Sequence, residues 1–253
     1  MAPLSATRIA AALALLWLGA PAGAGAADAL EEQQRRDALK HYRKGDEALH
    51  AEKLEEAARE FNTAIRLDPL LTVAHYGLGQ SYMGLRRYPD AVKAFEGCRE
   101  AFLAVSNLGL RNAAEADRRR TEAIQALRES IALLQRNTRL ATANQNSVRQ
   151  LEERVRELER ARQGGGEGLD VPAEVPFSLG SAYFRAGSLR DAEREYLAAI
   201  KANPKLGEAH SNLAVVYLLT DRPRDAQREV EVAEKAGFPV NPKLKQDIES
   251  KLR

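Results

Sequence analysis

Cysteine, net charge and strand-forming residues are all scarce in this sequence of 253 residues. Cys98 is the only cysteine, so no disulfide can form within the chain. Lysine and arginine number 38 and aspartate and glutamate 36, and the formal net charge of +2 gives no strong field for nucleic acid or an anionic membrane. Because Ala, Leu, Glu and Arg dominate instead, we predict an all-α protein.

The sequence also lacks the motifs that carry catalysis. It contains no G-x-S-x-G and no Cys/His constellation in a matching context. The glycine-rich run at 164–168 lacks the lysine and the preceding strand of a phosphate-binding loop, and we interpret it as a linker. We therefore predict no enzyme activity, no metal site and no cofactor.

One pattern of residues recurs four times, at 38–71, 72–105, 173–206 and 207–240. The run LGQSYMGLRRYPDAVKAF, which begins at Leu78, has the same residue types at the same offsets as the run that begins at Leu179. The period within each pair of copies is 34 residues. A fixed period of this size indicates a repeat architecture whose units must stack to bury their apolar faces.

Each copy has the pattern of two antiparallel helices. Apolar positions recur at helical spacing, Pro89 suits the first turn of a second helix, and Asp221 is placed to cap another. Small residues at one shared position predict the closest approach of the paired helices, with an aromatic side chain filling the seam. These small residues are Gly79, Gly180 and Ala214.

This pattern resembles the tetratricopeptide repeat (TPR), with its W-x2-L-G-x2-Y followed by Ala, Phe, Ala and Pro. The match is best at 72–105 and 173–206, and the tryptophan position holds His41, His75, Pro176 and His210. We interpret the histidines as helix-packing residues rather than ligands. Cys98 takes a position that holds alanine in the other copies, which favours a packing role.

The first 27 residues have the pattern of a secretory signal peptide. Arg8 precedes the apolar run IAAALALLWL, and the segment APAGAGA contains Ala24 and Ala26 as a cleavage pair. The apolar run is shorter than the roughly 20 residues of a membrane span. We predict a periplasmic or secreted protein with no stable membrane anchor after cleavage.

Residues 106–162 interrupt the repeats with a different period. Two apolar seams have the 3-4-3 spacing of a coiled coil or a long helical pair. They are Ile124, Leu127, Ile131 and Leu134, and Val148, Leu151, Val155 and Leu158. Ser147 followed by Gln150 matches a capping box and predicts the start of a second helix. We favour two antiparallel arms, about 112–137 and 148–162, over the alternative of one rod that pairs with its twin in a homodimer.

The segment Arg118–Arg120 raises the question of nucleic acid. Glu115, Asp117 and Glu122 surround it and no aromatic residues interleave to stack bases, so we predict no nucleic-acid binding and a solvated helix face.

These observations together predict an all-α TPR solenoid of four repeats in two pairs, interrupted by a helical hairpin or coiled coil. Near the C-terminus, Asn241-Pro242 predicts the start of a capping helix with an apolar stripe at Leu244, Ile248 and Leu252. The predicted divisions are a signal peptide at 1–27, repeats 1 and 2 at 28–105, the insert at 106–162, a Gly-rich linker at 163–172, repeats 3 and 4 at 173–240 and the capping helix at 241–253.

The resemblance implies a concave groove, lined by the first helix of each unit, that binds an extended or helical peptide. Carried over by position, the predicted groove residues are Tyr42, Asp46, Leu49, Tyr76, Gln80, Met83, Phe177, Ser181, Phe184, Ser211, Val215 and Leu218. Of these we expect Tyr42, Tyr76, Met83 and Phe184 to be exposed anchors. The Lys/Asn clamp of chaperone-binding TPRs is matched only at Asn212.

Three functions compete at this point. The first is a non-catalytic adaptor outside the cytoplasm that binds a protein partner; its parts are similar to those of the periplasmic cell-division coordinator family, which suggests envelope assembly. The second is a structural oligomer built on the insert. The third is a regulatory subunit of an envelope enzyme complex.

Overall fold

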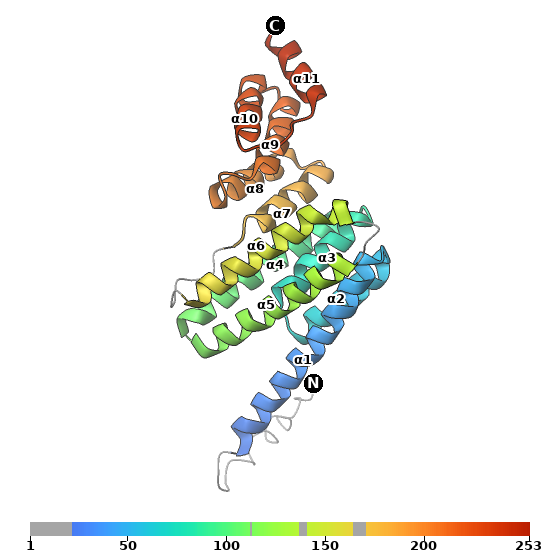
Figure 1. The fold of residues 1–253 in the computed structure, drawn as a ribbon, viewed down its shortest axis with the longest axis vertical. Helices are drawn as coiled ribbons and strands as arrows, with labels where there is room; N and C mark the ends of the chain where they lie inside the picture. Colours follow the sequence, from blue (N-terminus) through green and yellow to red (C-terminus); the bar gives the residue numbers. More distant parts are fainter. Residues whose placement is uncertain (1–21, 112, 137–140, 164–170) are drawn as a thin grey trace, which may run out of the picture.

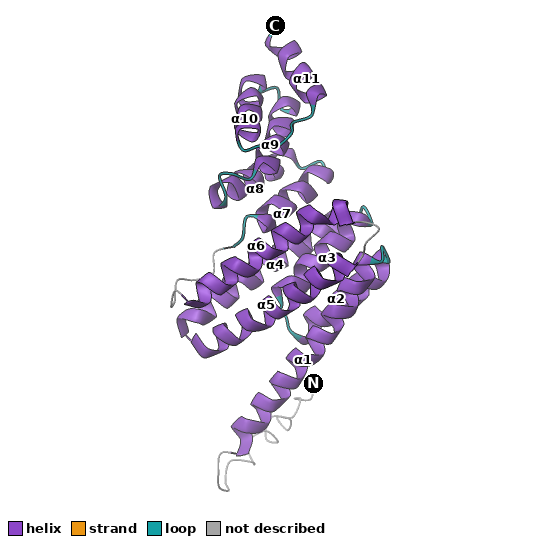
Figure 2. Cartoon of the chain, viewed as in Figure 1, coloured by secondary structure: helices purple, strands orange, loops and turns teal. Residues whose placement is uncertain are grey.

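The computed structural model of the chain describes residues 22–111, 113–136, 141–163 and 171–253. Every regular element within these ranges is a helix (Figure 2). The prediction of an all-α chain is therefore confirmed. The glycine-rich run at 164–168 and the apolar part of the predicted signal peptide lie outside the described residues.

The first repeat pair consists of four helices, α1 (Ala22–His50), α2 (Leu54–Leu67), α3 (Thr72–Gly84) and α4 (Tyr88–Arg111). The N-terminal part of α1 extends beyond the body of the molecule (Figure 1). Because α1 begins at Ala22, its first turns overlap the predicted cleavage region, and the signal peptide stays a prediction. Within the described ranges no helix combines the length and the hydrophobicity needed to cross a bilayer.

The second repeat pair follows the same plan at the other end of the molecule (Figure 1). It comprises α7 (Glu174–Arg185), α8 (Leu189–Ala202), α9 (Gly207–Leu219) and α10 (Pro223–Lys235). The short α11 (Pro242–Leu252) packs on α10 and ends the solenoid. Leu244 and Ile248 of α11 are buried in the core of this pair, whereas Leu252 is 38% exposed.

The paired helices meet at the predicted small residues. A Cβ atom added at Gly79 would lie 2.5 Å from the ring of Phe95, and one added at Gly180 would lie 2.9 Å from the ring of Tyr196. Both rings are almost completely buried. A larger side chain cannot fit there without displacing an aromatic ring, so the predicted repeat register is confirmed.

The two pairs stack directly on each other although the insert separates them in sequence. Tyr183 Oη donates a 2.7 Å hydrogen bond to Glu96 across the α4–α7 junction. The guanidinium of Arg99 lies 3.0 and 3.1 Å from the two carboxylate oxygens of the buried Glu195. A single solenoid therefore runs from α1 to α11.

The insert is a hairpin of two helices, α5 (Ala113–Arg136) and α6 (Ala141–Gln163). Ile124 and Leu127 of α5 pack against Val155 and Leu158 of α6, and all four are buried. The seams that the heptad spacing predicted thus face each other within one chain, which supports the hairpin over the rod.

Several predicted boundaries are wrong. Helix α4 continues to Arg111, past the predicted end of the repeat, and α6 begins at Ala141, so Ser147 lies inside a helix and is not its N-cap. Asp221 adopts a left-handed φ of 60° and pairs with Lys251, while Arg222 takes the N-cap position. The predicted cap at Asn241 is confirmed, because its side chain accepts a 2.9 Å hydrogen bond from the Lys243 amide.

Candidate protein-binding groove

The predicted groove residues lie on α1, α3, α7 and α9, the first helices of the four units. In the first pair this face is not open. The α5–α6 hairpin lies across it, so that α5 is beside α1 and the molecule is thickest there (Figure 1).

A buried polar network fixes α5 to α1. Ser130 Oγ donates a 2.8 Å hydrogen bond to Asp46 Oδ2 and lies 3.0 Å from Tyr42 Oη. The exposed fractions of Tyr42, Asp46 and Ser130 are 5%, 7% and 3%. The expectation that Tyr42 is an exposed anchor is therefore wrong, because the insert covers its ring and binds its hydroxyl group.

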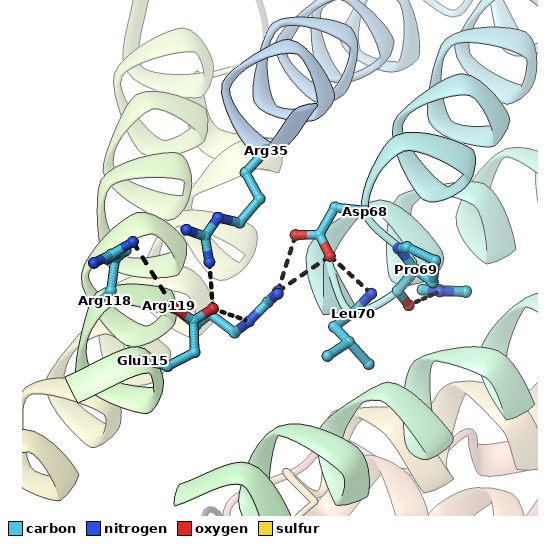
Figure 3. A network of polar contacts seen from close by, with 8 residues as sticks. Arg35, Asp68, Pro69, Leu70, Glu115, Arg118 and Arg119 are labelled. Carbon is cyan, nitrogen blue, oxygen red and sulfur yellow. Dashed lines mark hydrogen bonds and ion pairs between the residues drawn. The ribbon is translucent and has the colours of Figure 1, made fainter. Parts of the chain in front are cut away.

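Charged side chains add a second set of contacts between α5 and the first repeat pair. Arg119 of α5 lies 3.0 and 3.1 Å from the two carboxylate oxygens of Asp68, in the loop after α2, and 2.9 Å from Glu115 (Figure 3). Glu115 also pairs with Arg35 of α1. Farther along, Arg43 of α1 pairs with Glu129 of α5.

The prediction of a solvated face for Arg118–Arg120 is wrong for Arg119 and for Arg120, whose Nε is buried. The Arg119 side chain is only 15% exposed and points toward Asp68, whereas Arg118 is more than half exposed and lies on the far side of Glu115 from Asp68 (Figure 3). Asp68 is buried beside Arg119, and a buried carboxylate requires a partner of this kind.

Burial changes the acidity of groups in this interface. The pKa of Asp46 is raised above its ordinary value, chiefly because burial penalises the carboxylate, while His50 and the hydrogen bond from Ser130 oppose that shift. Burial likewise raises the pKa of Glu122 on α5, against the opposing charges of Arg35 and Arg119.

The middle of the groove is partly occupied by the junction between the pairs. Tyr76 Oη lies 3.0 Å from Ser178 Oγ of α7, and burial raises the pKa of Tyr76 to about 12. Met83 is half-buried beside the same junction, whereas Gln80 is exposed. Tyr76 is therefore a junction residue and not the free anchor that we expected.

The second pair presents a different surface at the equivalent positions. All six predicted residues are half-buried, and no described helix lies along them as α5 lies along α1. Ser181 takes the place of Asp46 and bonds within its own pair, donating to the Phe177 carbonyl at 3.0 Å and accepting from Tyr196 Oη at 3.3 Å. Phe184, Val215 and Leu218 give this face an apolar, uncharged character.

The histidines and the cysteine have the structural roles that the repeats predicted. His41 and His210 bond to Glu60 and Glu229 on the second helix of their units, each at 2.6 Å. His75 Nε2 lies 2.9 Å from the Pro69 carbonyl. Among the described residues no group of three metal-ligating side chains comes together. Cys98 is fully buried, and burial raises its pKa to about 12, so it is not a reactive thiolate.

Sequence reasoning missed the residues through which the hairpin binds the repeats. The heptad analysis found the face of α5 that meets α6, but not the neighbouring face that carries Ala126 and Ser130, both buried against the first pair. The signal was present as small residues four apart beside the apolar seam. Long-range ion pairs such as Arg119 with Asp68 have no comparable signature.

Comparison with known families identifies the tetratricopeptide repeat at residues 42–102 and 177–242, just over half of the chain. The chain belongs to the tetratricopeptide repeat family. No curated protein sequence matches it.

Some solved structures are similar to the chain at low sequence identity. A crystal structure of YrrB, described as a TPR protein with an unusual peptide-binding site, is 19% identical, with 90% of this chain and 97% of that chain covered and a TM-score of 0.30. TTC0263, a thermophilic TPR protein of Thermus thermophilus, is 18% identical over 85% of this chain and 98% of its own, with a TM-score of 0.31. A crystal structure of MamA is 19% identical over 76% and 94%, with a TM-score of 0.29.

Proposed function

We propose that this protein is a non-catalytic adaptor that binds a helix of a partner protein on the concave face of its second repeat pair. The observation that carries the proposal is the contrast between the two faces. Helix α5 of the same chain is seated on the first face, while the equivalent residues of the second remain half-exposed and apolar.

Helix α5 packs on the first concave face as a helix, and this supports a helix as the partner segment on the second face. It meets the repeats through the small residues Ala126 and Ser130, which lets the helix axis approach α1 closely. In helix-in-groove recognition an amphipathic helix lays its apolar face into a hydrophobic groove. Phe184, Val215 and Leu218 offer such a face without a buried charge, so the partner helix should carry an apolar stripe with at least one small residue.

Export and a role in envelope assembly are part of the proposal. They are supported by the signal-peptide pattern with Ala24 and Ala26.

The competing structural oligomer is less well supported. The apolar seam that a homodimeric rod would need is used inside the chain, where Ile124 and Leu127 pack on Val155 and Leu158. A regulatory subunit of an enzyme complex would use the same open face, and its partner helix would then come from that enzyme.

Site-specific photo-crosslinking tests the proposed face. A photoreactive residue at Val215, on the concave side, should capture one defined segment of a partner in cells of the source organism, and sequencing of the cross-linked peptide should show helical apolar spacing. The same residue at Glu231, exposed on α10, is the control and should capture nothing in common. Equal capture at both positions would contradict the proposal.

The captured segment then allows a binding measurement. Replacing Phe184 with Ala should weaken binding of that segment by about 1–2 kcal/mol, because large apolar anchors dominate such interfaces. Leu197→Ala, on an exposed residue of α8, removes similar apolar area away from the face and should leave the affinity unchanged. Loss of affinity in the Leu197 variant alone would place the partner elsewhere.

A further inference from the structure

A cavity lies between the hairpin and the first repeat pair, separate from the open face of the second pair. Its volume is about 460 Å³, within the range of roughly 300–1,000 Å³ that small-molecule sites occupy. Apolar side chains from α3, α4, α5 and α6 make up much of its wall. They include Val73, Phe102, Val105, Leu127, Leu151 and Leu158.

Three arginines line this space: Arg119, which is paired with Asp68, and Arg120 and Arg154. Arg154 of α6 stacks over the ring of Phe102, with its guanidinium carbon 5.0 Å from the ring centroid. Arg120 of α5 also lines the cavity, and its Nε is buried without a hydrogen-bond partner among the described residues. A buried N–H donor without an acceptor costs free energy unless a ligand supplies the acceptor.

Five acidic side chains also line the cavity: Asp46, Glu52, Asp68, Glu122 and Glu174. Asp68 is paired with Arg119, and Asp46 accepts from Ser130. Glu122 faces the positive charges of Arg35 and Arg119. What the described lining lacks is therefore an acceptor for the buried Nε–H of Arg120, and a single carboxylate beside Arg120 would supply it.

We propose that this cavity binds a straight-chain carboxylate of the fatty-acid type, with its head group on Arg120 and its chain among the apolar side chains. A carboxylate supplies the hydrogen-bond acceptor that Arg120 Nε lacks, and each methylene of the chain that is buried among the apolar side chains strengthens binding further. A polyanion fits less well, because Asp46, Asp68 and Glu122 line the same space and would repel additional negative charge.

Titration calorimetry with decanoate, below the concentration at which it forms micelles, tests the site on the full chain. Decanoate should bind with one site per chain. Decyltrimethylammonium, which has the same chain length and the opposite charge, and butyrate, which has the same head and little chain, should bind at least tenfold more weakly. Absence of decanoate binding, or equal binding of the cationic amphiphile, would overturn the proposal.

Variants of α5 locate the site. Arg120→Gln should weaken decanoate binding at least tenfold, while Arg118→Gln, the same change on an exposed side chain two residues away, should leave it unchanged. Ala123→Phe should fill the cavity and abolish binding, whereas Ala132→Phe, on an exposed residue of α5, should not. Circular dichroism melting of each variant establishes that it is folded. Equal effects of the Arg120 and Arg118 changes would contradict the assignment.

Discussion

The two repeat pairs share their internal packing and differ in what their concave faces meet. At two equivalent positions the first pair has an acid where the second has a neutral residue: Asp46 against Ser181, and Asp68 against Asn203. Asp68 and Asn203 accept the same turn hydrogen bond, from the amides of Leu70 and Lys205, each at 3.0 Å. The backbone geometry therefore does not require the acid.

The difference is explained by the hairpin. Ser130 donates to Asp46, and Arg119 pairs with Asp68, so both acids of the first pair have their partners on α5. The second pair has no helix in this place among the described elements, and it has no buried acid there that would need one. In this chain, acidic residues stand at these two positions in the pair that the hairpin covers, and neutral residues stand there in the pair that it does not cover.

The largest effect should come from breaking the charged contact that only the first pair has. Arg119→Met leaves Asp68 buried without its guanidinium partner and should destabilise the fold by about 3 kcal/mol. Arg118→Met, whose 3.9 Å ion pair with Glu115 is solvent-exposed at the arginine, should cost less than about 1 kcal/mol. Urea unfolding measures both, and equal losses would mean that Arg119 does not support the hairpin.

The next effect concerns the packing that both pairs share. Gly180→Leu forces a side chain into the ring of Tyr196 and should cost about 1–3 kcal/mol. Ala198→Leu on an exposed residue of α8 is the matched control and should leave the melting temperature almost unchanged. A melting temperature unaffected by the Gly180 change would show that the repeat register is wrong.

The third effect compares the two concave faces by making the same serine-to-alanine change on each and measuring the loss of stability. Ser130→Ala removes the hydrogen bonds that Ser130 makes with Asp46 and Tyr42 and should cost about 1–2 kcal/mol. Ser181→Ala on the second face removes only contacts within its own pair and should cost about half as much or less. Thermal unfolding of the two variants compares them, and a larger loss at Ser181 would contradict the account of the covered face.

The smallest effect is a dependence on pH. The raised pKa of Asp46 means that the folded state holds this proton more tightly than the unfolded state, so its contribution to stability is greatest at low pH and is lost as the pH rises through the folded pKa. Asp46→Asn removes this penalty and should stabilise the fold at pH 7 by less than about 1 kcal/mol. The gain should vanish below pH 3.8, the ordinary value; a gain that grows on acidification would contradict it.

Most of the fold was predictable because repeats repeat their packing. Gly79 and Gly180 stand at one shared position and meet Phe95 and Tyr196 in the same way, so one periodic pattern predicted both seams. The start of α6 was not predictable, because Ser147 with Gln150 suits an N-cap equally well when the helix has already begun at Ala141.

The site was less predictable than the fold. Position in the repeat indicates that Tyr42 and Phe184 face the groove, but it cannot indicate that one of them meets another part of the chain. That depends on contacts between residues far apart in sequence, such as Tyr42 with Ser130. The role of the groove residues in binding stays a prediction.

Hydroxyl-radical footprinting with mass spectrometry tests the covered and open faces most directly. In the free chain we predict that Tyr42 is protected, while Phe184 and Val215 are modified, and that adding the cross-linked partner segment protects Phe184 and Val215 without changing Tyr42. Modification of Tyr42 to the same extent as Phe184 in the free chain would contradict the claim that the hairpin occupies the first face.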